Sequence, residues 1–578
     1  MFSKFYQSEL AYLREMGRAF SVAQPTVAPL LAEQSADPDV ERLLEGFAFL
    51  TARIRERLED AVPELSHELT QLMLPHYLRP VPSCSVVEFS APIRALRGPV
   101  RIPRGTELCS APVEGTSCSF RTTEDVDLLP AALTRVTMAR TSSTATELRL
   151  FFETTEASRG AVLGQPLRLY LHGELATAAL LFMSLMKHCR GVSLRDAKGA
   201  EQFRLSSDSL VAPGFDASST LFPWPPLVPL GFARVQEYFT LPQKFLFVEV
   251  RGLEKAPAPT EDIFELAFLV EDMPAISGTV SAENFRLSCS PVVNLFSTST
   301  DPLRQSAPGQ EHFLRASGMT PQHAEVFSVD QVVGIRHGER SVYQPFSLFP
   351  HLSQKGNKSF YQVHRSRSAI DSGTDAVLVI GSPLEVKLQT NEEVISVDVT
   401  CTNRLLPGRL ALGDINRGRD SLPGGARVKN ISMATQPVSP PLGSELHWRL
   451  ISHLAVTQRT LADDQALRGL LEVYNLQVYG DVGVARANSS RVQALRRVQA
   501  TRTRRLYRGS TVQGTRLEVD IEEKPFGSLG DLYLFGCVLD ALFASFVTMN
   551  SFSELKVKTE PSRFEFVWPL RIGTKLSQ

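Results

Sequence analysis

The organisation of the chain is decided by residues 36–83, which read ADPDVERLLEGFAFLTARIRERLEDAVPELSHELTQLMLPHYLRPVPS. Asp37 can cap a helix N-terminus, and Pro38 suits the first helical position, where its missing N–H costs nothing. One face of a helix of about six turns, at 3.6 residues per turn, then collects the apolar residues. They are Val40, Leu43, Leu44, Phe47, Leu50, Ile54, Leu58 and Ala61. This spacing predicts a long amphipathic helix.

A second, shorter helix is expected to begin at Pro63, and Pro75, Pro80 and Pro82 end helix formation. Another amphipathic helix is predicted over residues 1–20. Two interpretations fit this N-terminal part. The helices form a hairpin that packs on its own domain, or their apolar stripe meets helices of other subunits in a bundle. Periodicity alone does not separate the two.

The length and composition predict an ordinary globular protein of several domains. The chain has 578 residues, of which 43% are hydrophobic and 21% charged, and such a length exceeds what one core supports. The net charge of −1 gives no global field that would attract nucleic acid. The seven cysteines form no CxxC pair, and we expect reduced, buried thiols. The N-terminus lacks the order of a signal peptide, and no apolar run is long enough to span a bilayer, so a cytoplasmic protein is expected.

The predicted fold class is α+β and multidomain: N-terminal amphipathic helices, β-rich sandwich-like domains, and a mixed α/β C-terminal domain. The predicted domains are 1–83, 84–230, 231–400 and 401–578. Short β-branched runs bounded by Gly, Pro and Ser predict strands from about residue 84 to 400, with one buried helix at Leu175–Met186. A proline-rich linker is expected to lead from residue 222 to a strand at Phe245–Val250. In the last domain we expect helices near 446–454, 467–474 and 532–549, and strands at 517–521 and 564–567.

Few strings have the form of a catalytic or metal site. Asp371-Ser372-Gly373-Thr374 matches the D-[ST]-G-[ST] pattern of aspartic proteases, but no second copy occurs and these residues are common in turns. His67-Glu68 begins like HExxH, although residue 71 is Gln. Asp125-Val126-Asp127 is interpreted as a solvated turn. We therefore predict no catalytic residues, no metal site and no cofactor.

Residues 491–508, RVQALRRVQATRTRRLYR, hold seven arginines and no acid. Arginine clusters bind phosphate or acidic partners. The neutral chain and the scarcity of interleaved aromatics favour a flexible or partner-facing basic loop over a nucleic-acid site.

Nine strings along the chain resemble the TssF family (also called VasA or ImpG), baseplate subunits of the bacterial type VI secretion system. They are DPDVERLLEGFAFLTARI (37–54), LPHYLRPVPS (74–83), EYFTLPQKFLFVEVRGL (237–253), NLFSTSTDPL (294–303), EVFSVDQV (325–332), TCTNRLLPGRL (400–410), WRLISHLAV (448–456), LRGLLEVY (467–474) and LYLFGCVLDALFASFVTMNSF (532–552). Their order and spacing extend the resemblance over nearly the whole chain.

The resemblance implies a structural, non-enzymatic wedge subunit that assembles with TssG and TssK into the platform on which the contractile tail is built. It further implies two TssF copies per TssG, a contact with another TssF copy, and contacts with TssE and the VgrG spike hub. No nucleic acid and no direct membrane insertion are expected. The implied location is cytoplasmic, at a baseplate docked to the inner membrane.

Under this resemblance the N-terminal stripe becomes a candidate protein interface. The candidate interface residues are Phe2, Phe5, Leu13, Val40, Leu43, Phe47, Leu50, Ile54 and Leu58. Two other hypotheses stay open from the residues alone. One is a hydrolase with Asp371 in a dimer-shared aspartyl pair, and the other is a β-sandwich protein that binds glycan or nucleic acid through the arginine cluster.

Overall fold

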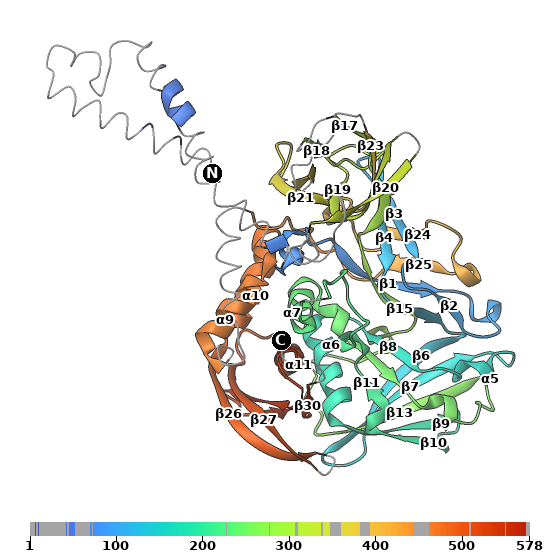
Figure 1. Cartoon of the computed structure of the whole chain (residues 1–578). Helices are drawn as coiled ribbons and strands as arrows, with labels where there is room; N and C mark the ends of the chain where they lie inside the picture. Colours follow the sequence, from blue (N-terminus) through green and yellow to red (C-terminus); the bar gives the residue numbers. More distant parts are fainter. Residues whose placement is uncertain are drawn as a thin grey trace. The chain divides into compact units, whose positions relative to one another are not determined.

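The computed structural model describes ten stretches in continuous detail. They are residues 73–226, 228–276, 278–306, 310–336, 339–346, 360–381, 393–442, 462–507, 510–549 and 551–573. Before them, residues 6, 10, 42, 45–51, 70 and 71 are described, and all are helical. The chain divides into two compact units: one combines Met1–Leu74 with Pro441–Ile451, and the other combines Pro75–Pro440 with Ser452–Gln578. The sheets and helices that follow belong to the second unit (Figure 1).

A six-stranded antiparallel sheet is assembled from distant parts of the chain. Its strands, in order across the sheet, are β24 (Ile415–Gly418), β3 (Glu107–Val113), β4 (Thr116–Thr122), β15 (Cys289–Val293), β1 (Cys84–Ser90) and β25 (Arg427–Asn430). In the registers of β1, Val86 lies opposite Pro291 of β15, and Val87 lies opposite Asn430 of β25. The sheet therefore crosses the predicted boundaries at 230/231 and 400/401.

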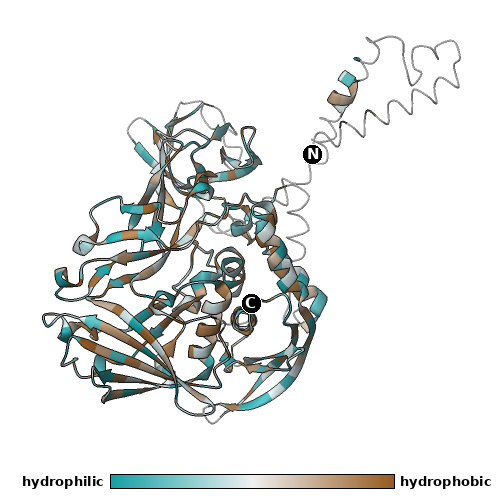
Figure 2. Ribbon diagram, turned by 180° about the vertical axis from the view of Figure 1, so that it is seen from behind, coloured by the Kyte–Doolittle hydropathy of each residue, from teal (hydrophilic) through white to brown (hydrophobic). Residues whose placement is uncertain are grey.

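Three smaller sheets lie in the segment from residue 100 to 286. A five-stranded sheet has the order β10 (Glu201–Ser206), β9 (Cys189–Asp196), β13 (Ile263–Glu271), β7 (Ala145–Thr154) and β6 (Ala131–Arg140). A four-stranded sheet has the order β11 (Leu210–Val211), β12 (Phe247–Val250), β8 (Leu167–Leu171) and β14 (Phe285–Arg286). The strands β2 (Val100–Ile102) and β5 (Val126–Leu128) form a separate two-stranded sheet. Apolar and polar bands alternate along many strands in Figure 2, as expected where one face is buried.

An eight-stranded sheet occupies much of residues 296–402. Its order is β16 (Phe296–Ser299), β23 (Glu393–Thr402), β19 (Glu325–Arg336), β20 (Glu339–Pro345), β21 (Phe360–Arg367), β22 (Thr374–Gly381) and β18 (Glu311–Phe313), and β17 (Leu303–Gln305) also pairs with β23. β20 and β21 run parallel, and the other pairs are antiparallel. Its own core includes Val332, Leu378, Ile395 and Val399, all fully buried.

The last sheet closes the C-terminal part. Its order is β26 (Leu495–Tyr507), β27 (Ser510–Glu522), β28 (Ser551–Glu560) and β29 (Glu565–Val567), and β30 (Arg571–Ile572) also pairs with β28. β26 and β27 form an antiparallel hairpin, whereas β27 and β28 run parallel. Parallel strands require a crossover connection, and here the crossover contains a helix.

Among its described residues, the second unit has the helices α5 (Arg159–Val162), α6 (Leu175–Met183), α7 (Leu230–Thr240), α9 (Asp464–Val473), α10 (Val482–Gln493) and α11 (Leu529–Ala544). α11 is the crossover between β27 and β28. It packs against α6, α7 and β28, and most of its residues are buried. A helix that is apolar nearly all round must be covered on all sides, which explains why three elements from distant parts of the chain surround it.

Two glycines allow these helices to approach closely. A Cβ at Gly530 of α11 would lie 2.3 Å from the backbone carbon of Ala179 in α6. A Cβ at Gly231 of α7 would lie 2.6 Å from Cα of Leu542 in α11, and the Gly231 N–H donates to Ser545 Oγ at 2.8 Å. Both ends of α11 are therefore fixed by backbone-to-backbone contact.

The helix α7 has charged side chains, Arg234 and Glu237, that are buried in the core. Gly231–Thr240 are all buried, and Glu237 accepts hydrogen bonds from Arg234 Nη1 at 2.9 Å and from Lys244 Nζ. Burial lowers the pKa of Lys244 to about 8, an effect that Glu237 opposes. The other Glu237 oxygen accepts from the Leu221 N–H at 2.7 Å. One carboxylate thus compensates two buried cations.

The predicted fold class is confirmed: the chain is multidomain α+β and rich in sheet. The structure confirms the buried helix at Leu175 and the helix that begins after Asp463, whose carboxylate accepts from the Ala466 N–H at 3.3 Å. The prediction of a linker from residue 222 to 244 was incomplete, because α7 lies within it. The predicted helix near 446–454 lies outside the described residues. All seven cysteines are free, as predicted, and five of them are buried.

Substitution of Gly530 by Ala should destabilise the second unit, because the new methyl group overlaps the α6 backbone. Forcing one extra carbon into such a contact costs about 1–3 kcal/mol. Gly469, an exposed glycine of α9 around which a Cβ would meet no atom within 4 Å, is the matched control. Gly469→Ala should stabilise by about 0.5–1 kcal/mol because Ala favours helix. Urea unfolding measures the change in the free energy of unfolding for each variant. If both variants were stabilised, or both destabilised, the packing described above would be contradicted.

Substitution of Glu237 by Gln should be strongly destabilising, because it leaves Arg234 and Lys244 buried without a counter-charge. Breaking a buried ion pair in this way costs about 3–5 kcal/mol. Glu201→Gln, which breaks the exposed pair with Arg204, is the control and should change stability by less than about 0.5 kcal/mol. Urea unfolding compares the two variants, and a similar small change in both would show that the buried charges do not depend on Glu237.

Candidate assembly site

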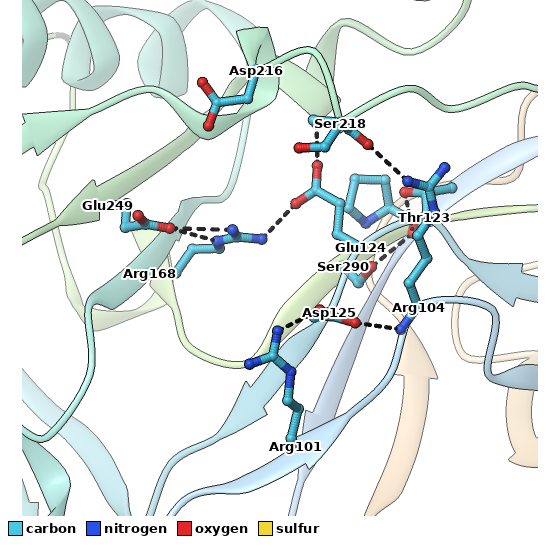
Figure 3. Close-up of polar contacts among 12 residues, drawn as sticks. Arg101, Arg104, Thr123, Glu124, Asp125, Arg168, Asp216, Ser218, Glu249 and Ser290 are labelled. Atoms are coloured by element: carbon cyan, nitrogen blue, oxygen red, sulfur yellow. Dashed lines mark hydrogen bonds and ion pairs between the residues drawn. The ribbon is translucent and has the colours of Figure 1, made fainter. Parts of the chain in front are cut away.

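A strongly charged pocket with a volume of about 240 Å³ lies where β2, β5, β8 and η5 (Pro213–Phe215) meet. Figure 3 shows its side chains. Arg101 donates to Asp125, and the backbone N–H of Arg104 donates to the other Asp125 oxygen at 2.7 Å. Arg168 of β8 lies between two carboxylates: Nη1 donates to Glu124, and Nη2 donates to Glu249 at 3.2 Å.

These pairings decide what the pocket can do chemically. The hydrogen bond from Arg101 holds the pKa of Asp125 below its usual range, whereas burial raises the pKa of Asp127. Glu124 also accepts from Ser219 Oγ, and Arg104 Nη1 donates to the Ser218 carbonyl at 2.8 Å. The carboxylates of Glu124, Asp125 and Glu249 are thus committed to arginines. The ion pairs of the pocket therefore join four segments of the chain. The prediction of a turn at 125–127 was wrong, since Val126–Leu128 form β5.

A second polar cluster joins the six-stranded and eight-stranded sheets. Asn294 and Asn403 are fully buried and bond reciprocally: the Asn403 N–H donates to Asn294 Oδ1 at 2.7 Å, and Asn294 Nδ2 donates to Asn403 Oδ1 at 2.8 Å. The Ser119 N–H of β4 donates to Asn403 Oδ1 at 2.7 Å. Both asparagines belong to strings that carry the family resemblance, so those strings meet in space.

Asp371 forms a turn and an ion pair rather than half of a proton-sharing pair. Its Oδ1 accepts from the Gly373 N–H at 2.9 Å, and its Oδ2 accepts from Nε of the buried Arg404 at 2.6 Å. Burial alone would raise the pKa of Asp371, but these hydrogen bonds lower it overall. A Cβ on Gly373 would lie 2.6 Å from Arg404 Nε, so a larger residue there would displace the guanidinium. The turn interpretation is confirmed.

The arginine-rich segment is not the loop that the sequence predicted. Arg491 lies in α10 and donates to the buried Asp531 of α11 at 2.9 Å, and residues 495–507 form β26. The loop prediction was wrong because β26 carries arginines on both faces and so lacks the apolar alternation that marks a strand. No sequence signal other than its Thr and Val content indicated a strand.

Among the nine candidate interface residues, Phe47 and Leu50 fall within the described part of the first unit. Their side chains are exposed by 57% and 60%, although Ala48 between them is fully buried. The other seven lie outside the described residues: Phe2, Phe5, Leu13, Val40, Leu43, Ile54 and Leu58. His67-Glu68 of the incomplete zinc motif also lies outside them. The interface therefore stays a prediction.

The described residues hold neither a metal-binding cluster nor a membrane-spanning helix. Within the part of the chain that the structure describes, no group of three or more His, Cys, Asp or Glu side chains is arranged to hold a metal ion. Among the same residues, no helix combines the length and the apolar character that a membrane crossing requires.

Comparisons with known proteins agree over the length of the chain. The model of the family described as "Type VI secretion system, TssF" matches residues 1–575. A Pseudomonas aeruginosa protein described as type VI secretion system component TssF1 is 30% identical, over 99% of this chain and 98% of its own.

Two solved structures are also similar. A chain in the structure of the type VI secretion system TssK–TssF–TssG baseplate subcomplex matches with a TM-score of 0.79 and 29% identity, over 93% of this chain and 100% of that one. A chain in the structure of the baseplate complex from the type VI secretion system matches with a TM-score of 0.68 and 26% identity, over 100% of both chains. The family match, the relative and the shared fold lead to one conclusion: the chain belongs to the TssF family and is a baseplate subunit of the type VI secretion system.

Proposed function

We propose that this chain acts as a structural wedge subunit that assembles with a TssG-like and a TssK-like protein. The observation that carries the proposal is the similarity to a chain of the solved TssK–TssF–TssG subcomplex, which extends over 93% of this chain. The proposed stoichiometry is two copies of this chain per TssG-like protein, in contact with one another.

The proposed assembly surface is the N-terminal stripe. Phe47 and Leu50 are more than half exposed in the isolated chain. Large apolar side chains at the centre of a predicted helical stripe favour association with another apolar helix, since burying each one stabilises a complex by about 1.5–3 kcal/mol. Phe47 and Leu50 would therefore gain burial from a partner.

The proposed role involves no catalysis. Glu124 and Asp125 in the charged pocket, and Asp371 in its turn, are each bound to an arginine, which favours the charged carboxylate and opposes proton sharing. This arrangement suits a rigid scaffold. We further propose contacts with TssE-like and VgrG-like proteins, and a cytoplasmic baseplate docked at the inner membrane.

Co-expression with the TssG-like and TssK-like proteins of the same bacterium should yield a stable complex. Native mass spectrometry should show two copies of this chain for each copy of the TssG-like protein, because the proposed wedge is built with that ratio. If the chain stayed monomeric and bound neither partner at micromolar concentration, the proposal would be contradicted.

Substitution of both Phe47 and Leu50 by Asp should abolish assembly, because two charges would then have to be buried in the helical bundle. Association should weaken by at least a hundredfold, measured by native mass spectrometry and by gel filtration of the mixed subunits. The second unit should unfold in urea as in the unsubstituted chain.

Two controls accompany this double variant. Phe47→Leu with Leu50→Met keeps the apolar surface and should assemble normally. Phe313→Asp with Val342→Asp places the same charges on side chains that are exposed by 53% and 55% elsewhere in the chain. If that pair blocked assembly equally, or if Phe47→Asp with Leu50→Asp left no folded protein, the stripe would not be the specific interface.

A further inference from the structure

β26 is a long strand at the edge of its sheet. It spans 13 residues, or about 40 Å at 3.3 Å per residue, and in the described part of the chain it pairs with β27 alone. The register is continuous from Arg497 opposite Asp520 to Tyr507 opposite Ser510. The other side of β26 therefore presents a row of backbone N–H and C=O groups that can accept one more strand.

The outer half of this strand is exposed on both faces. Val498 is buried, but residues 499–502 and 504–506 are exposed, and Leu506 is exposed by 77%. β27 pairs with β28 through residues 513–522 only, so the tip of the β26–β27 hairpin extends beyond this pairing. Natural edge strands are usually shorter or covered.

The charge on this edge is positive and partly uncompensated. β26 contains five arginines and no acidic residue. Arg496 pairs with Glu522 and Arg505 with Glu554 at 3.2 Å, whereas Arg502 and Arg504 make no ion pair with any residue described. By strand alternation Arg502 and Arg504 share one face, two residues apart, at the spacing of side chains on a paired strand.

This charge selects what can pair with the edge. A second copy of β26 would place arginines beside arginines, which is repulsive. An extended segment with acidic residues at alternate positions would satisfy the backbone groups and the arginines together. Nucleic acid fits less well, because single strands bind through stacked aromatic side chains and β26 has one aromatic residue, Tyr507.

We propose that β26 is a docking edge for an extended, acidic segment of another protein chain, which adds to the C-terminal sheet as a further strand over residues 499–506. The acidic side chains of that segment lie beside Arg502 and Arg504. This interaction is separate from the N-terminal stripe and does not depend on the wedge role.

The test uses the full chain and a fluorescein-labelled peptide of twelve residues in which Glu and Val alternate. Fluorescence anisotropy should show saturable binding that weakens with added salt. Hydrogen exchange of the bound chain should show new protection confined to residues 495–507. Arg502→Glu with Arg504→Glu should raise Kd at least tenfold.

The matched control is Arg417→Glu with Arg427→Glu, which makes the same charge change on β24 and β25, the two edges of the six-stranded sheet. It should leave Kd within twofold. Absence of peptide binding, protection elsewhere, or equal loss in both double variants would overturn the proposal. Binding of a twelve-nucleotide oligothymidylate in place of the peptide would also overturn it, in favour of nucleic acid. The protection experiment on the unsubstituted chain decides the matter even if the variants fold poorly, and none of these failures bears on assembly with the TssG-like protein.

Discussion

The burial of α11 is the constraint on which the second unit depends. A sixteen-residue helix with apolar side chains nearly all round is stable in water only when it is enclosed. α6, α7 and β28 enclose it, and the glycines at 231 and 530 allow two of these contacts to be made by backbone. Each of the three covering elements belongs to a different part of the chain, so the packing of one helix joins distant sequence into a single body.

Polar clusters fix the arrangement of the sheets around that core. The reciprocal asparagine pair, the Arg404–Asp371 pair and the Arg168 bridge each connect segments that are far apart in sequence. Buried polar groups are costly unless they are fully paired, so each cluster tolerates one arrangement of its segments. This explains why the two family strings that contain Asn294 and Asn403 meet in the interior, where they specify the scaffold.

The sequence predicted those features that depend on local pattern. The apolar run at 532–549 and the Asp463 cap led to helices that the structure confirms, and the family resemblance is confirmed as well. α7 was missed because its buried charges, Arg234 and Glu237, look like surface residues until their partners are known. β26 was missed because it carries arginines on both faces and its outer half is exposed. Neither the Arg168 bridge nor the crossing of predicted domain boundaries has a local signal, since each depends on pairing between distant residues.

The distance in sequence between α6 and α11 also has a consequence for synthesis. The ribosome completes α11, which ends at Ala544, about 360 residues after α6, which ends at Met183; this corresponds to roughly 20–70 s at elongation rates of about 5–20 residues per second. During much of that interval the surface of α6 that α11 will cover is open, and the six-stranded sheet still lacks β25. The nascent chain therefore exposes apolar surface that favours aggregation until α11 and β28 have been synthesised.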